Sequence, residues 1–98
     1  MTPITILQSA ADERPDWVSR CMASVVDWSQ QHGYRYHCTG DELFDWVTPE
    51  LGAKLRDRTS ILADLARLRW IEAELSARGG LVVWIDADTL VVDPSWRV

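Results

Sequence analysis

The chain has 98 residues, of which 47% are hydrophobic and 26% charged, a composition typical of one folded domain and not of a disordered segment. Its net charge is −5 and it has no cluster of Lys and Arg, so we do not expect DNA or RNA as a partner. The sequence has no secretory signal and no apolar run that would span a bilayer. Its two cysteines fit neither a zinc motif nor a disulfide framework, and the expected location is the cytoplasm.

The first half of the chain predicts a strand, a helix and a second strand. Residues 4–7, ITIL, form a short β-branched run typical of a strand buried on both faces. A polar loop follows, and Pro15 suits the first turn of a helix that Gly33 ends. The apolar residues at helical spacing in between are Val18, Cys21, Met22, Val25 and Trp28. Residues 34–38 are the second predicted strand.

The second half predicts helices and then a third strand. Residues 39–57 contain turn residues, and we expect one or two short helical pieces there. The strongest helical pattern covers residues 59–78, before two glycines. Residues 81–86 read as a strand, and extended chain continues over residues 89–92. The order β-α-β-α-α-β predicts a single α/β domain with a mainly parallel sheet and flanking helices.

Two acids, Asp86 and Asp88, fall where the third strand is expected to end. Ligands of open parallel sheets bind beyond the carboxyl ends of the strands. Residues two apart on extended chain point the same way, so the two carboxylates would form a hard oxygen site suited to Mg²⁺ or Mn²⁺. Two ligands do not cage such an ion, so water and phosphate oxygens would complete its shell. The alternative is that both acids merely begin a turn.

The long helix carries a second candidate pair. One apolar stripe is predicted to face the core, and Asp64 falls inside this stripe. The stripe consists of Ile61, Leu65, Leu68, Ile71 and Leu75. Arg67 lies three residues after Asp64 and within side-chain reach. The two form either a structural ion pair or a carboxylate and a guanidinium offered to a ligand at the same edge of the sheet.

Taken together, these residues resemble the GT-A glycosyltransferases, specifically the DXD-containing sugar-transferase families. Those families show a helix with D-x-x-R, then two glycines, then a strand that ends in D-x-D. Residues 60–94 follow that order, with Asp64 and Arg67 on the helix, Gly79–Gly80 after it, and Asp86 and Asp88 after the strand. The resemblance implies a Rossmann-like GT-A fold that binds the nucleotide-diphospho-sugar donor.

The resemblance also implies roles for individual residues. Asp88 would coordinate a divalent metal, Mn²⁺ or Mg²⁺, and Asp86 would contact the ribose or the metal shell of a UDP- or GDP-sugar. Asp64 would bind ribose or the donor sugar, and Arg67 would stabilise the donor. The residues expected near the nucleotide base are Gln8, Ser9 and Ala10. No catalytic residue is identified.

Other interpretations remain open. GT-A enzymes usually continue far beyond D-x-D, so residues 1–98 would form only the donor-binding half and would be inactive in isolation. The chain could instead be a non-catalytic α/β module that pairs with itself or with another chain. A phosphohydrolase of the haloacid dehalogenase type also places D-x-D at a strand end, with Asp86 as nucleophile. Leu90 stands where such enzymes have Thr, which argues against this interpretation.

Overall fold

The central strand, β1 (Ile4–Ser9), is hydrogen-bonded on both sides in the computed structural model, which describes residues 2–98. Its neighbours are β2 (Arg35–Thr39) and β3 (Leu81–Trp84), and both pair with it in parallel. The strand order is therefore β2-β1-β3. The predicted α/β fold with a parallel sheet is confirmed.

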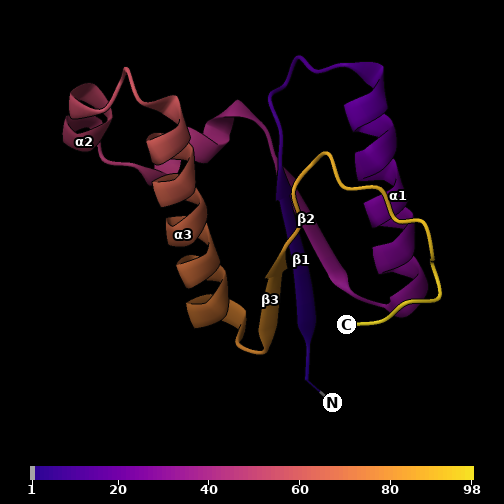
Figure 1. Ribbon diagram of the computed structural model, residues 1–98. Helices are drawn as coiled ribbons and strands as arrows, with labels where there is room; N and C mark the ends of the chain where they lie inside the picture. Colours follow the sequence, from indigo (N-terminus) through magenta and orange to yellow (C-terminus); the bar gives the residue numbers. More distant parts are fainter. Residues whose placement is uncertain (1) are drawn as a thin grey trace.

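Helices cover both faces of this sheet (Figure 1). Helix α1 (Asp16–His32) joins β1 to β2 and lies on one face. The connection from β2 to β3 lies on the other face and contains the 3₁₀ helix η1 (Asp41–Trp46), α2 (Pro49–Lys54) and α3 (Thr59–Arg78). The two crossovers run in opposite directions from β1, and right-handed crossovers of opposite direction place their helices on opposite faces.

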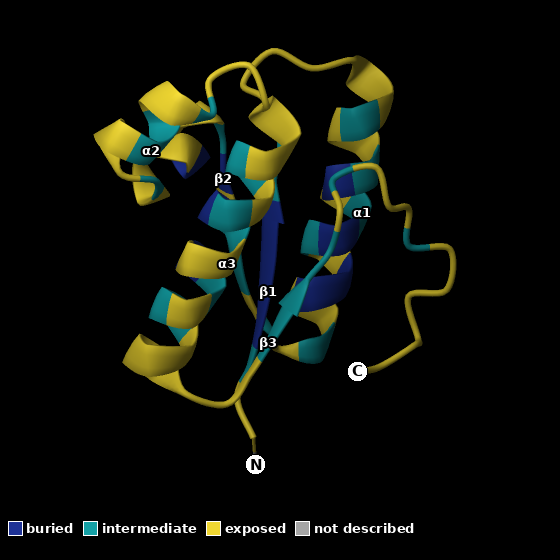
Figure 2. Cartoon of the chain, turned by 60° about the vertical axis from the view of Figure 1, so that its left-hand side comes forward, coloured by how far each residue is buried: buried dark blue, intermediate teal, exposed yellow. Residues whose placement is uncertain are grey.

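Each face of the sheet has its own apolar cluster because side chains alternate along a strand. On β1, Leu7 packs with Ala66 and Trp70 of α3, whereas Ile6 packs with Val25 and Trp28 of α1. β3 follows the same alternation. Val82 and Trp84 pack toward α3, and Val83 and Ile85 toward α1. Figure 2 shows the buried strand β1 between the two helical layers.

The end of α1 is the end that the sequence predicted. Gly33 has φ of 72°, the left-handed conformation that only glycine adopts readily. Its N–H donates to the carbonyl of Gln30 at 3.2 Å, and the N–H of Tyr34 donates to that of Ser29 at 2.9 Å. These bonds satisfy carbonyls of the last turn and lead the chain directly into β2.

The predicted core stripe of α3 is wrong for three of its five residues, whereas Ile71 does pack against the cluster around Leu7. Leu68 is 63% exposed, and Ile61 and Leu75 are each 44% exposed. The buried residues are instead Ala66 and Trp70, on the opposite side of the helix. Small Ala66 permits close approach to the sheet, and the large ring of Trp70 fills the space beside Trp84, with ring centroids 5.8 Å apart. The placement of Asp64 within a core stripe is therefore also wrong.

The chain after β3 also differs from the prediction. The ladder continues for one bond, from the N–H of Ile85 to the carbonyl of Leu7, and a turn then closes from Thr89 N–H to the carbonyl of Asp86 at 3.0 Å. Residues 89–98, which we call the strap, form no strand and run back along α1 (Figure 1).

Hydrogen bonds hold the strap on α1. The indole N–H of Trp28 donates to the carbonyl of Trp96 at 2.7 Å, and the two rings stack with centroids 5.8 Å apart. His32 Nε2 bonds the carbonyl of Pro94 at 2.7 Å. The backbone N–H of Val91 donates to the hydroxyl of Ser24. These polar contacts fix an irregular segment that lacks a ladder of its own.

The turn between α3 and β3 generates a prediction. Gly80 has φ of 77°, and a Cβ at this position would run into the carbonyl oxygen of Pro3. Gly80→Ala should lower the free energy of unfolding by about 1–3 kcal/mol, measured by urea denaturation. Gly52→Ala in α2 is the control, because nothing lies within 4 Å of its added Cβ. Equal effects of the two substitutions would contradict the prediction.

Candidate functional site

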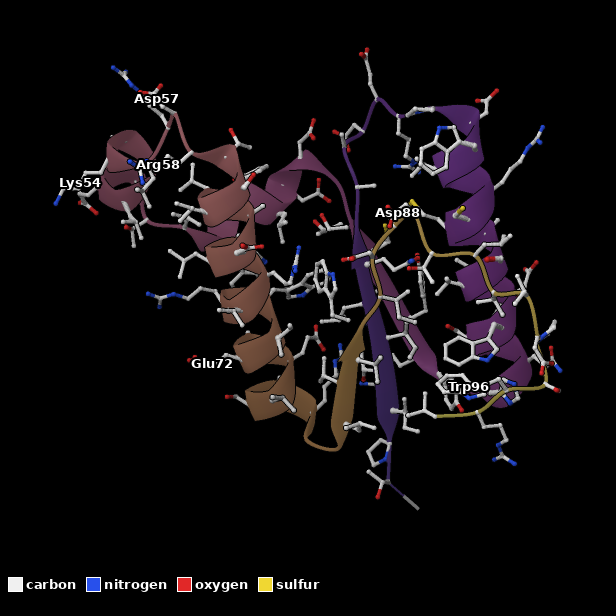
Figure 3. The ribbon with its side chains drawn as sticks, viewed as in Figure 1. Lys54, Asp57, Arg58, Glu72, Asp88 and Trp96 are labelled. Atoms are coloured by element: carbon white, nitrogen blue, oxygen red, sulfur yellow. The ribbon has the colours of Figure 1, made fainter. Side chains whose placement is uncertain are left out.

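The predicted site residues meet where the strand order reverses. The chain passes from β1 to β2 on one side of β1, whereas β3 pairs with the other side of β1. The carboxyl ends of β1 and β3 are therefore neighbours at the topological switch point, where the direction of the connections reverses. Open α/β sheets bind ligands at such a point. Residues 8–10 belong to the end of β1 and the start of its loop, and residues 86–88 follow β3. Figure 3 shows Asp88 at this end of the sheet.

Gln8 is fully buried and holds the switch point together. Its Oε1 accepts from the hydroxyl of Tyr36 at 2.7 Å, and its Nε2 donates to the backbone carbonyl of Asp86 at 3.4 Å. Burial raises the pKa of Tyr36 well above its usual range, so the hydroxyl keeps its proton and remains a donor. One amide thus links β1, β2 and the exit from β3.

The last residue of β1 and the first residue of the following loop are less buried than Gln8. Ser9 and Ala10 are half-buried, and the N–H of Ala10 donates to the carbonyl of Thr39 at 3.2 Å. The side chain of Gln8 is engaged inside the protein, whereas Ser9 and Ala10 lie nearer the surface. Contact of these residues with a nucleotide base remains a prediction.

Asp86 and Asp88 are both exposed, but they do not lie on continuous extended chain. The turn from Asp86 to Thr89 separates them, so the geometry assumed for two strand residues on one face is wrong. The turn interpretation is confirmed for the backbone. The carboxylate of Asp86 accepts from the indole N–H of Trp84 at 3.2 Å, which fixes its orientation.

Arg67 connects helix α3 to this end of the sheet. Its guanidinium carbon lies 4.8 Å from the ring centroid of Trp84, a cation–π contact. Its Nη2 lies 3.6 Å from Oδ1 of the exposed Asp64, so the structural ion pair is present. Contacts therefore run from Asp64 through Arg67 and Trp84 to Asp86. The buried Nε of Arg67 has no hydrogen-bond partner among residues 2–98.

Further acids lie in the loops after β1 and β2 that the sequence analysis did not single out. Asp12 and Asp41 each accept the other's backbone N–H at 3.4 Å. Backbone N–H groups of Gly40 and Glu42, and the Thr39 side chain, lower the pKa of the Glu42 carboxyl. The signal for Asp41 and Glu42 was the acidic pair in "TGDE" directly after a predicted strand. Across residues 2–98, no three His, Cys, Asp or Glu side chains are grouped to hold a metal.

Comparison with models of known protein families, with curated proteins and with solved structures found no match to this chain. By its own geometry the chain is an α/β domain with a three-stranded parallel sheet. No helix within residues 2–98 has the length and apolar character needed to cross a membrane.

The buried pair of Gln8 and Tyr36 gives a second prediction. Gln8→Leu leaves the Tyr36 hydroxyl without its acceptor, and Tyr36→Phe leaves the Gln8 carbonyl without its donor. Each should lower the free energy of unfolding by about 1–3 kcal/mol. The double variant should lose clearly less than the sum, because neither polar group is then left alone. Urea denaturation of all four proteins measures this coupling, and strictly additive losses would contradict it.

Proposed function

We propose that this chain binds the diphosphate of a nucleotide-sugar through a divalent cation held by Asp86 and Asp88, as the donor-binding part of a GT-A glycosyltransferase. The observation that carries the proposal is the position of these two exposed carboxylates at the switch point, beside the loop after β1. This is where an open parallel sheet binds its ligand.

The donor atoms suit the proposed cation. Carboxylate oxygens are hard ligands, and Mg²⁺ in nucleotide sites is usually held by one or two carboxylates together with phosphate oxygens and water. Asp86 and Asp88 supply two such groups, and no third candidate ligand is grouped with them in residues 2–98. When bound, the cation would neutralise negative charge on the departing diphosphate.

Arg67 and Trp84 complement the two carboxylates in the proposed site. The Trp84 ring supports the guanidinium of Arg67, and the Trp84 N–H orients the carboxylate of Asp86. We propose that Arg67 stabilises the donor, since guanidinium groups match phosphate oxygens in geometry and charge. Asp64, paired with Arg67, would contact the ribose or sugar. Ser9 and Ala10 would lie near the base.

The proposal concerns donor binding and assigns no catalytic residue. The phosphohydrolase alternative gains no support from the geometry, because Leu90 lies exposed in the strap and D-x-D follows an edge strand. A non-catalytic module remains compatible with the same site, since binding does not require transfer.

The cation site is tested with Asp88→Ala. Isothermal titration of the chain with UDP or GDP should show binding that depends on Mn²⁺, and Asp88→Ala should weaken it by at least about tenfold because one of two protein ligands is lost. The control is Asp57→Ala, an exposed acid before α3 that Figure 3 shows far from Asp88. Unchanged binding in Asp88→Ala, or no Mn²⁺-dependent binding in the native chain, would refute the proposal.

The role of Arg67 is tested separately. Arg67→Gln removes a cation that would pair with the diphosphate, so nucleotide binding should weaken by about tenfold or more, whereas binding of Mn²⁺ alone should not change. Arg69→Gln, at an exposed position two residues further along α3, is the matched control. An equal loss in both variants would show a general charge effect instead of a specific contact.

A further inference from the structure

β3 is an edge strand with unpaired backbone groups. The N–H groups of Leu81 and Ile85 donate to β1, to the carbonyls of Pro3 at 2.9 Å and Leu7 at 3.0 Å. By alternation along the strand, Val82 and Trp84 turn their N–H and C=O groups away from β1. Within residues 2–98, no strand pairs with this outer side. An apolar edge of this kind is a template for another strand.

An apolar cavity lies next to this edge, on the face that α1 covers. It has a volume of about 350 Å³ and is formed between the end of β3, α1 and the strap. Its apolar lining comes from Trp28, Ile85, Leu90, Val91, Val92 and Trp96. A strand added to β3 would direct alternate side chains toward this face, so the cavity is placed to receive one of them.

We propose that β3 pairs in antiparallel orientation with β3 of a second copy of this chain, across a two-fold axis at Val83. Val82 then lies opposite Trp84 of the other copy, and Trp84 opposite its Val82. Both pairs are of the hydrogen-bonded kind, in which the two residues exchange two N–H···O bonds. All outward groups of Val82 and Trp84 are satisfied in both copies, because the strand is complementary to itself about Val83.

The side chains agree with this register. Leu81 lies opposite Ile85 of the other copy. Both point to the α1 face, because each is two residues from Val83 and alternate residues of a strand point to the same face. Leu81 is 43% exposed, and pairing places it beside the cavity that Ile85 lines. On the other face, Val82 packs against Trp84, a favourable cross-strand pair.

Asp86 lies level with Gly80 of the other copy, two residues after Arg78. The guanidinium of Arg78 is bonded to Glu74 of its own helix at 3.0 Å, so the pairing rests on the backbone groups and the apolar side chains and not on charge. Because the two-fold axis is perpendicular to the sheet, the α3 helices of both copies lie on the same face of it. The product is one continuous six-stranded sheet, in which β2-β1-β3 of one copy is joined through β3 to the same three strands of the other.

The first test is the oligomeric state of the 98-residue chain, measured by sedimentation equilibrium over a wide concentration range. A reversible dimer is expected. Val82→Pro removes one outward N–H from each copy, and so two hydrogen bonds per dimer, while it leaves the bonds to β1 in place. The dissociation constant should rise about thirtyfold, with circular dichroism unchanged. A native chain that stays monomeric at every concentration would overturn the proposal.

A matched pair of substitutions locates the interface. Leu81→Lys places a charge at the proposed contact and should abolish the dimer, whereas Leu68→Lys makes the same change on the outer side of α3 and should not. Both leucines are exposed in the single chain, so neither change should prevent folding. Dissociation by Leu68→Lys but not by Leu81→Lys would place the interface on α3 and overturn the proposal.

Hydrogen exchange tests the register itself. The amides of Leu81 and Ile85 are bonded to β1 and should be protected at low and high protein concentration alike. The amides of Val82 and Trp84 should exchange quickly at low concentration and become protected as the dimer forms. A dimer that leaves these two amides unprotected uses another surface. None of these readouts needs a metal or nucleotide, so they are independent of the proposed function.

Discussion

The pairing of β1 on both sides is the constraint from which the remaining architecture follows. Because β2 and β3 lie on opposite sides of β1, the two crossovers run in opposite directions and their helices cover opposite faces. The same arrangement brings the carboxyl ends of β1 and β3 together. Gln8, fully buried at this point, can then reach Tyr36 on one side and the backbone of Asp86 on the other.

Periodicity and turn residues were sufficient to predict the order of elements, the parallel sheet and the end of α1 at Gly33. They failed for the orientation of α3, because this helix carries apolar residues on both sides. Pattern alone could not decide between the stripe that includes Leu68 and the side that includes Ala66 and Trp70. The decision is tertiary: Trp70 packs edge-on against Trp84, a residue of a strand that follows later in the chain.

The location of Asp86 and Asp88 beyond a strand end could be predicted, whereas their local geometry could not. A turn of the backbone follows Ile85, and the sequence "TLVV" after the acids favours extended chain. The connection from Arg67 through Trp84 to Asp86 was also missed, because it depends on a cation–π contact between different elements. It gives a physical link between the helix pair and the strand acids, on which the proposed donor site relies.

The strap has a consequence for how the chain folds. The buried indole of Trp28 finds its acceptor on Trp96, 68 residues later, and β1 is completed only when β3 arrives. Contacts of such sequence separation carry a large loop-closure entropy and slow folding. Until residues 89–98 are synthesised, the indole N–H of Trp28 therefore lacks its native acceptor, and until β3 is synthesised β1 has an open side. The nascent chain reaches its native hydrogen bonding only after its strap is available.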